Sequence, residues 1–404
     1  MKIALIGFEF ESSNKGCEAL TYSFLPILSK IIPKKSEIIV INIHDTLGEI
    51  PVLYNDFTFK NIHIRLKNIK SLWMVKRELK TCNIAFDITH GDSFSDIYGK
   101  KWLVQTNLIK QMVINQNVPL ILLPQTYGPF NSEILEKWTI KILNNTYAIY
   151  SRDNLSTEYL KKILSTKYHN KISTYTDLAF ALPYNKKKYN LSSKKKKIGI
   201  NISGLLWNDC INSNKFNLNV NYRDYCIKLI ETLLLDKNNE IFLVPHVICD
   251  EREGNNYFEN DTTACKEVKK MFPMCNMIDK FENASDAKSL ISNLDCLVAA
   301  RMHASIAAFS SNCASIPFAY SRKFAGIYNS LEYNYIIDGR KETTHDAINK
   351  TISYITKSEI LKKEASKSMG VLLKDLDAFQ KDLANNIEII KRSSKYEENN
   401  KRNN

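Results

Sequence analysis

Short apolar runs alternate with longer amphipathic segments along most of the chain. In the first half, we expect strands over the runs 2–7, 37–43, 83–89, 118–123 and 147–151. Several of these runs are apolar throughout, which is typical of parallel strands that helices cover on both faces. Apolar residues at helical spacing predict helices over 17–32, 101–115, 132–143 and 154–164.

The same alternation returns after a lysine-rich stretch. It predicts strands over 197–202, 240–245, 295–299 and 315–320, and helices over 222–235, 262–271 and from about His303. Strands that alternate with helices indicate βαβ units. We therefore expect two tandem Rossmann-like domains in a GT-B-like arrangement, with an interdomain cleft and a C-terminal helical segment. The expected boundaries are 1–185, a linker 186–197, 198–357, helices 358–392 that pack back, and a polar tail 393–404.

The chain of 404 residues is basic, with Lys plus Arg 56 against Asp plus Glu 43 and a net charge of +13. Such an excess favours a polyanionic neighbour. Seven of the lysines lie at 186–188 and 194–197, where a solvated linker and a binding patch are both open interpretations. Nucleic-acid surfaces usually interleave such charge with stacking aromatics, so nucleic acid is not the expected partner.

The nine cysteines include no Cys-x-x-Cys pair and no spacing typical of zinc ligands. Disulfides and a metal site are therefore not expected, and a reducing cytoplasm fits best. No apolar run is long enough to span a bilayer, so we expect any membrane contact to be peripheral. The sequence also has no nucleotide-binding glycine loop, which leaves no resident cofactor to predict.

The most informative stretch is 294–326. An apolar strand ends at Arg301 and His303, just where a helix rich in small residues begins, and Ser305 lies in its first turn. A fixed cation, an imidazole and helix N–H groups around one point suit a phosphate or a carboxylate. Tyr320, Arg322 and Lys323 follow the next strand. The alternative is that Arg301 and His303 make only a capping or interdomain contact.

The run from Asn283 to Gly326, which includes this stretch, closely resembles the carboxyl-terminal signature of the polysaccharide pyruvyl transferase family. The family's Arg-Leu-His triplet, Pro-containing strand and Tyr-x-x-Lys element appear here as Arg301-Met302-His303, Pro317 and Tyr320-Ser321-Arg322-Lys323. Four further segments resemble family elements in the family's order: NKGCEAL from Asn14, PQTYGP from Pro124, SRDNLS from Ser151 and YTDLAFALP from Tyr175.

Two departures affect what the resemblance implies. The family's usual triple glycine reads His90-Gly91-Asp92, and the proline that commonly follows the aspartate equivalent to Asp177 is Leu178. A titratable side chain at position 90 stands where backbone normally approaches the ligand, so the acceptor sugar cannot be carried over from the family. Asp177 is expected to be structural and to hold the turn into the linker.

The resemblance implies an enzyme that transfers the enolpyruvyl group of phosphoenolpyruvate onto two sugar hydroxyls, forming a pyruvate ketal and releasing phosphate. The donor carries two anionic groups and therefore needs fixed cations. We assign catalysis to His303 and Arg301, and donor binding to Arg152, Arg301, Met302, His303, Ser305 and Lys323. The alternative for His303 is that it only hydrogen-bonds phosphate, and for Tyr320 that it is a packed aromatic.

The acceptor would be a glycan or a polyprenyl-linked saccharide for a cell-surface polysaccharide such as a capsule. Its expected contacts on the amino-terminal domain are Asn14, Glu18, His90, Asp92 and Gln125, although Glu18 could simply favour a helix start. The expected location is the cytoplasm or the inner face of the cell membrane, with peripheral contact to anionic lipid.

Two other function classes stay open on the residues alone. A GT-B nucleotide-sugar glycosyltransferase would share the architecture, and Glu251 and Glu259 have the Glu-x7-Glu spacing of some such enzymes, but in a polar, Gly-containing region. A non-catalytic protein could instead bind a phosphorylated glycan through the lysine-rich stretch. His246, which ends an expected strand, is not expected to contact substrate.

Overall fold

The computed structural model describes residues 1–43, 56–97, 99–212, 214–249 and 257–402, without the side chains of 210–212, 257, 322, 323, 325 and 394–402. The chain forms two compact units. The first unit contains Met1–Glu11, Ser23–Leu178 and Leu373–Asn404. The second contains Ser12–Tyr22 and Ala179–Leu372.

A parallel sheet of seven strands forms the centre of the first unit, in the order β3-β2-β1-β4-β5-β6-β7. Its strands are β1 (Lys2–Ile6), β2 (Glu37–Asn42), β3 (Thr58–His63), β4 (Ile84–Asp87), β5 (Leu120–Gln125), β6 (Ala148–Ser151) and β7 (Ile172–Thr174). The central strands β4, β5 and β6 are buried at every position, whereas the edge strand β3 is mostly exposed or half-buried. Burial on both faces explains the uninterrupted apolar runs.

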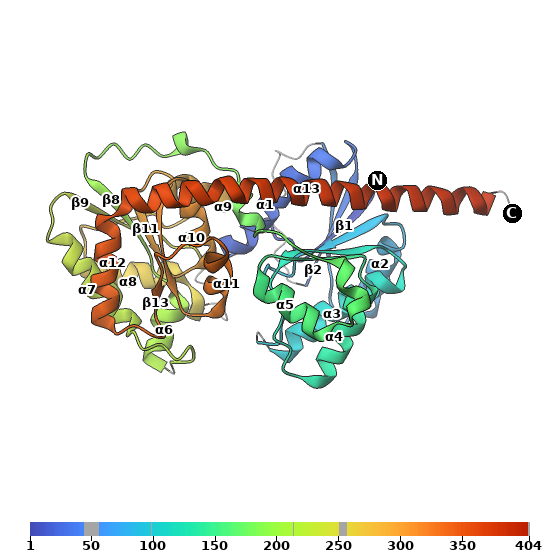
Figure 1. The fold of residues 1–404 in the computed structure, drawn as a ribbon, viewed down its shortest axis with the longest axis horizontal. Coiled ribbons are helices and arrows are strands. Elements are labelled where there is room, and N and C mark those ends of the chain that lie inside the picture. Colours follow the sequence, from blue (N-terminus) through green and yellow to red (C-terminus); the bar gives the residue numbers. More distant parts are fainter. Residues whose placement is uncertain (44–55, 98, 213, 250–256, 403–404) are drawn as a thin grey trace. The chain divides into compact units, whose positions relative to one another are not determined.

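Helices connect these strands and cover the sheet (Figure 1). They are α1 (Lys15–Ile31), α2 (Ile69–Leu79), α3 (Lys100–Asn115), α4 (Glu133–Asn145) and α5 (Asn154–Ile163), with 3₁₀ turns at Thr166–Lys171 and Leu178–Ala181. The part of α1 up to Tyr22 and the turn from Ala179 onward belong to the second unit. Local capping sets some of the helix starts: the side chain of Asp153 accepts from the Ser156 N–H at the start of α5. Leu122, Leu143 and Ile149 belong to the apolar core between sheet and helices.

The second unit contains a parallel sheet of six strands, in the order β10-β9-β8-β11-β12-β13. Its strands are β8 (Lys196–Asn201), β9 (Asn239–Leu243), β10 (Asn276–Met277), β11 (Cys296–Ala299), β12 (Ala314–Ala319) and β13 (Ile337–Asp338). Chain order reverses between β8 and β11, which is where ligands of such sheets usually bind. The expected fold class is confirmed: two parallel α/β sheets with a long C-terminal helix.

The helices of the second unit are α6 (Gly204–Asn212), α7 (Tyr222–Leu234), α8 (Asp261–Met271), α9 (Ala284–Ile291), α10 (Met302–Phe309), α11 (Arg322–Ser330) and α12 (Thr344–Thr356). Short 3₁₀ turns lie at Lys186–Lys188 and Tyr257–Glu259. The main core packs α7 and α12 against one face of the sheet through residues such as Leu229, Ile316 and Ile348. Small residues of α10, including Ala304 and Ala308, pack on the opposite face with Ala299 of β11.

The C-terminal helix α13 runs from Ser358 to Arg402 as one element. The polar tail expected from residue 393 therefore continues the helix, because the stretch contains neither proline nor glycine to end it. Residues up to Leu372 belong to the second unit and later ones to the first. In the first unit, Asp375 accepts from the Thr176 N–H at 2.5 Å, and Asn386 donates to the Tyr150 hydroxyl at 2.7 Å.

Two segments belong to a different part of the structure than the expected domain boundaries assigned them to. Residues 12–22 belong to the second unit, because the Ile248 N–H donates to the Ser13 carbonyl at 2.7 Å and Asn14 forms a β-bridge with Val247. The lysine-rich stretch also belongs there. In it, Lys188 forms ion pairs with Glu282 at 2.8 Å and Asp286 at 3.0 Å, and β8 begins at Lys196.

Candidate functional site

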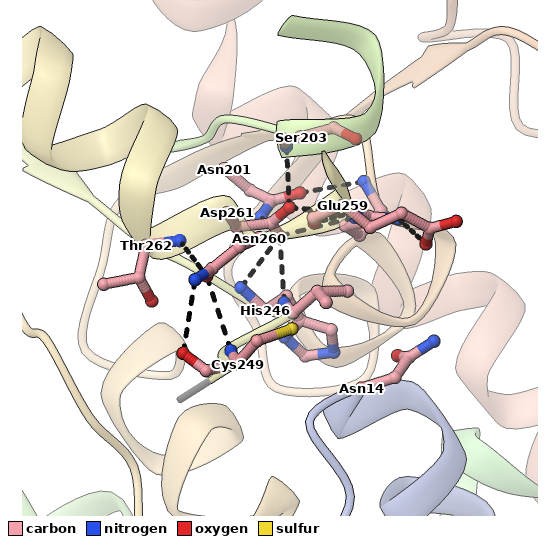
Figure 2. A network of polar contacts seen from close by, with 12 residues as sticks. Asn14, Asn201, Ser203, His246, Cys249, Glu259, Asn260, Asp261 and Thr262 are labelled. Carbon is pink, nitrogen blue, oxygen red and sulfur yellow. Dashed lines mark hydrogen bonds and ion pairs between the residues drawn. The ribbon is translucent and has the colours of Figure 1, made fainter. Parts of the chain in front are cut away.

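A buried aspartate organises the carboxyl ends of β8, β9 and β11 in the second unit. Asp261 is the first residue of α8 and is fully buried. Its carboxylate accepts from the Gly204 N–H at 2.8 Å and from the His246 and Val247 N–H groups at 3.0 Å each (Figure 2). These backbone bonds fix the carboxylate at the point where three strand ends meet.

Arg301 is bound to this carboxylate. Its Nη2 lies 2.8 Å and its Nε 3.1 Å from Asp261 Oδ1, and Nη2 also donates to the Glu259 carbonyl at 2.7 Å. The Arg301 backbone N–H donates to Asn201 Oδ1 at 2.8 Å. Burial disfavours the charged form, but Asp261 outweighs it and raises the pKa of Arg301. The guanidinium is therefore a permanent cation in a fixed orientation.

One edge of that guanidinium is not taken up by hydrogen bonds. Within the described ranges, Nη1 of Arg301 makes no hydrogen bond, and its nearest acidic group is the Glu259 carboxylate, at 3.8 Å. The side chain is 10% exposed. Nη1 is thus the part of Arg301 that can reach a bound anion.

His303 lies in the first turn of α10, two residues after Arg301, and contacts the amino-terminal loop of the same unit. A Cβ atom placed on Gly16 would lie 2.3 Å from His303 Nδ1 and 2.9 Å from its Cγ. The imidazole therefore packs directly on the backbone of Gly16, and a larger residue there would have to displace the imidazole. This contact explains the glycine in the Asn14-Lys15-Gly16 segment.

The residues around Gly16 are held by their own loop. Asn14 Oδ1 accepts from the Gly16 N–H at 2.9 Å, and the Lys15 N–H donates to the His246 carbonyl at 3.0 Å. The fully buried Glu18 accepts from Lys15 Nζ at 2.7 Å and from the Ser12 N–H at 2.8 Å. Burial raises the pKa of Glu18 although Lys15 opposes this. Asn14 and Glu18, expected on the amino-terminal domain, thus lie in the second unit, in the segment whose Gly16 contacts His303.

The other expected donor-site residues of this unit are less accessible. Ser305 is fully buried, and its hydroxyl donates to the Met302 carbonyl at 2.6 Å and accepts from the Tyr328 hydroxyl at 2.7 Å. Met302 is buried as well. Tyr320 packs against the Phe216 ring with centroids 5.1 Å apart. The side chain of Lys323 lies outside the described residues.

In the first unit, His90 follows β4 at the carboxyl edge of the sheet. Its Nε2 lies 3.2 Å from Glu9 Oε1, and its ring lies against Trp102 with centroids 5.2 Å apart. Burial opposes the charged imidazole, but Glu9 prevails and raises the pKa of His90. His90 has a positive φ of 55°, a conformation that favours glycine, at the position where the family usually has glycine.

The same edge holds the other expected residues of the first unit. Arg152 follows β6, and its Nη1 lies 2.7 Å from Asp177 Oδ2, with both side chains fully buried. Burial opposes the charge of Arg152, while Asp177 and then Asp92 raise its pKa. Gln125 ends β5, is fully buried and donates to the Asp87 carbonyl at 3.4 Å. The structure therefore gathers His90, Asp92, Gln125 and Arg152 in one unit, and Arg301 and His303 with Asn14 in the other.

Two residues at the Arg301 site did not emerge as candidates from the sequence. Asp261 was expected only as the residue before a helix, and His246 was not expected to contact substrate. A hydrophilic pair Asn260-Asp261 at a helix start is a common capping pattern, and only the fold shows that Asp261 points to Arg301. In the described part of the chain, no group of three or more His, Cys, Asp or Glu side chains could hold a metal ion.

A comparison with protein families matches residues 14–322 to polysaccharide pyruvyl transferase. The chain belongs to the polysaccharide pyruvyl transferase family. The match runs from Asn14 to Arg322 and so includes Arg301 and His303. Family membership makes the protein an enzyme, and it implies phosphoenolpyruvate as donor and a polysaccharide as acceptor. A comparison with curated proteins found no match.

Solved structures with the same GT-B-like fold include several sugar-processing proteins. HepE of Anabaena, solved with UDP, is 9% identical with a TM-score of 0.57, covering 94% of this chain and 100% of its own. The α,α-trehalose 6-phosphate synthase of Burkholderia multivorans is 7% identical with a TM-score of 0.57, covering 97% and 99%. UDP-GlcNAc 2-epimerase of Methanocaldococcus jannaschii is 10% identical with a TM-score of 0.53, covering 86% and 92%. At these identities the likeness concerns the fold alone.

Proposed function

We propose that the enzyme transfers the enolpyruvyl group of phosphoenolpyruvate onto two hydroxyls of one sugar in a cell-surface polysaccharide or its lipid-linked precursor. The observation that carries the proposal is the pairing of Arg301 with His303 at the start of α10. There the Asp261 carboxylate orients the guanidinium and Gly16 accommodates the imidazole. The family match supports the reaction class.

The donor carries a phosphate and a carboxylate on the same carbon, so a binding site must offer fixed cations and N–H donors. Arg301 provides a guanidinium whose Nη1 edge is available, and the first turn of α10 adds helix amides. A preorganised cation does not have to reorganise when the phosphate develops charge as it leaves. We propose that Lys323 and Arg152 supply additional positive charge for the donor and that Ser305 and Met302 shape the site.

The chemistry needs a proton delivered to the donor's methylene carbon. In the proposed sequence the first sugar hydroxyl attacks the central carbon while that proton, given up by an imidazolium, turns the methylene into a methyl group. The attacking oxygen then loses its own proton to the imidazole, which restores the imidazolium. The second hydroxyl then attacks the same carbon, the bond to the phosphate oxygen breaks, and the second hydroxyl's proton leaves with the phosphate. We assign the first proton to His303.

The acceptor residues of the proposal are Asn14 in the second unit and His90, Asp92 and Gln125 in the first, with Glu18 fixing the loop that carries Asn14. Amide, imidazole and carboxylate groups are the usual partners of sugar hydroxyls. Because His90 replaces the backbone approach usual in the family, we propose that it contributes to the choice of acceptor.

We further propose a polyprenyl-linked acceptor, used at the inner face of the cell membrane for a capsule or exopolysaccharide. The net charge of +13 supports a peripheral contact with anionic lipid. Within the described ranges, no helix is both long and apolar enough to cross a membrane. Lys194 and Lys195 are exposed, and replacing both with glutamate should weaken sedimentation with vesicles that contain acidic phospholipid. Unchanged sedimentation would contradict a lysine-mediated contact.

The test of the reaction is phosphate release from phosphoenolpyruvate with a panel of polyprenyl-linked saccharides. We expect His303→Ala to lower kcat by about 10²- to 10⁴-fold, the usual contribution of a general acid. His345→Ala is the matched control, since His345 is an exposed histidine of α12 in the same unit. The proposal would be refuted if no saccharide in the panel increased the release of phosphate, or if the rate of release were equal in wild type and His303→Ala.

A nucleotide-sugar glycosyltransferase would give a different binding profile. Phosphoenolpyruvate should raise the Tm of the wild-type enzyme, because a ligand that binds only the folded state stabilises it. Stabilisation by a UDP-sugar without any by phosphoenolpyruvate would favour the glycosyltransferase instead.

A further inference from the structure

His246 is a buried histidine whose ring makes no hydrogen bond to any residue that the structure describes. The residue is 2% exposed, and within the described ranges neither ring nitrogen has a hydrogen-bond partner. A neutral imidazole offers one donor and one acceptor, and buried polar groups are almost always partnered. Its side chain therefore lacks the partners that a purely structural histidine would have.

The backbone of His246 is fixed from both sides. Its N–H donates to Asp261 Oδ2 at 3.0 Å, and its carbonyl accepts from the Lys15 N–H at 3.0 Å. On the side of His246 both bonds use main-chain atoms only, so any residue other than proline at position 246 could make them. Nothing in these contacts requires an imidazole, and a leucine or methionine would fill the same space without leaving two nitrogens unpartnered.

The ring lies among the charged groups of the candidate site. Figure 2 shows it projecting from the Asp261 network toward the side on which Asn14 lies. Gly16, two residues after Asn14, contacts the His303 ring. The same short loop thus touches the backbone of His246 and the side chain of His303.

The surrounding charge is positive. Burial and then the neighbouring His303, Arg301 and Lys15 lower the pKa of His246 to about 3, so its ring is neutral at physiological pH. Of the carboxylates that the structure describes at the site, Asp261 is engaged with Arg301 and Glu18 with Lys15, and Glu259 lies 3.8 Å from Arg301 Nη1. A neutral N–H donor in a positive surrounding is suited to an anion.

We propose that His246 is a further ligand-contacting residue of the donor site and donates a ring N–H to the phosphate of phosphoenolpyruvate, and to the phosphate after its release. With His303 and Arg301 it would form a phosphate site made of two imidazoles and a guanidinium. This inference rests on the proposed function and adds to it a residue that neither the sequence pattern nor the Arg-x-His pair indicates.

His246→Leu and His246→Gln test the inference on the full-length enzyme, with inorganic phosphate and phosphoenolpyruvate as probes. We expect the Tm of ligand-free His246→Leu to equal or exceed that of wild type, because the unpartnered polar group is gone. Its stabilisation by phosphate should be lost, and its KM for phosphoenolpyruvate should rise about ten- to a hundredfold, the usual worth of a hydrogen bond to a charged group. His246→Gln keeps an N–H donor, so it should recover part of the stabilisation by phosphate and part of the affinity for phosphoenolpyruvate.

Further measurements separate the possible outcomes. In wild-type enzyme labelled with ¹⁵N-histidine, phosphate should shift the ring signals that His246→Gln removes, and unshifted signals would overturn the inference even if His246→Leu does not fold. A lower Tm for His246→Leu, with phosphate stabilisation and KM unchanged, would assign the residue a structural role and overturn it too. Either result leaves the proposed function standing if wild type is stabilised by phosphoenolpyruvate. A wild type that neither phosphoenolpyruvate nor phosphate stabilises contradicts the proposed function as well.

Discussion

Replacing Asp261 with asparagine removes the charge that holds Arg301 in place. The fully buried carboxylate accepts from three backbone N–H groups and from the guanidinium, whose Nη2 is 2.8 Å away. The variant's amide nitrogen is a donor and would face donors, and the negative charge that Arg301 pairs with would be lost, whereas the bond from Nη2 to the Glu259 carbonyl at 2.7 Å would remain. Breaking a buried ion pair by changing one partner typically costs about 3–5 kcal/mol.

The assay should report on the second unit alone. Three of the four tryptophans, Trp73, Trp102 and Trp138, belong to the first unit, and Trp207, which is buried in α6, belongs to the second. Replacing the first three with phenylalanine makes urea unfolding, followed by fluorescence, specific for the unit that contains Asp261. In this background we expect Asp261→Asn to lower the free energy of unfolding by about 3–5 kcal/mol.

Asp346→Asn is the matched control, because Asp346 also lies in the first turn of a helix of this unit but is exposed. Its effect should stay within about 0.5 kcal/mol. A double-mutant cycle with Arg301→Met should give a coupling free energy of about 2 kcal/mol between Asp261 and Arg301. An Asp261→Asn effect no larger than that of the control, or a coupling near zero, would refute the idea that this carboxylate fixes the guanidinium.

The remaining predictions concern a glycine and a lysine. Gly16→Ala places a methyl group 2.3 Å from His303 Nδ1, so the rate of phosphate release should fall at least tenfold. The control is Gly370→Ala, in α13 with open space around it, which should keep wild-type activity and gain up to about 1 kcal/mol of stability. Equal activity of the two variants would contradict the contact between Gly16 and His303. Burial lowers the pKa of Lys288 to about 7 from 10.5. The unfolded state therefore binds more protons between pH 7 and 10.5, and Lys288 makes the free energy of unfolding rise with pH by up to about 1.4 kcal/mol per unit. Urea unfolding at pH 7, 8 and 9 should show a smaller rise for Lys288→Met, and parallel curves would disprove the assignment.

Much of the fold follows from apolar patterning, because central parallel strands are buried on both faces. The runs at 118–123 and 315–320 contain almost only apolar residues and became β5 and β12 within two residues. The edge strand β3 (Thr58–His63) was not predicted, since its sequence TFKNIH is mostly polar and only one of its residues is buried. Edge strands of this kind carry no continuous apolar signal.

The candidate site was predictable in part for a similar reason. Arg301 and His303 are two basic residues at the end of an apolar strand, a pattern that a single stretch of sequence contains. Their partners are remote in the chain: Asp261 lies 40 residues before Arg301, and Gly16 lies near the amino terminus. The bond between the Lys15 N–H and the His246 carbonyl is equally non-local, so local patterning could not single out His246.

The division of the chain has a consequence for biosynthesis. Because residues 12–22 belong to the second unit and 373–404 to the first, neither unit is encoded by one uninterrupted stretch of the gene. Most of the first unit is synthesised before the second, yet Tyr150 and Thr176 can bond to Asn386 and Asp375 only after that part of α13 has been synthesised. Cutting the gene at the lysine-rich stretch would deprive both products of native packing, so this enzyme cannot be dissected into two independent halves at that point.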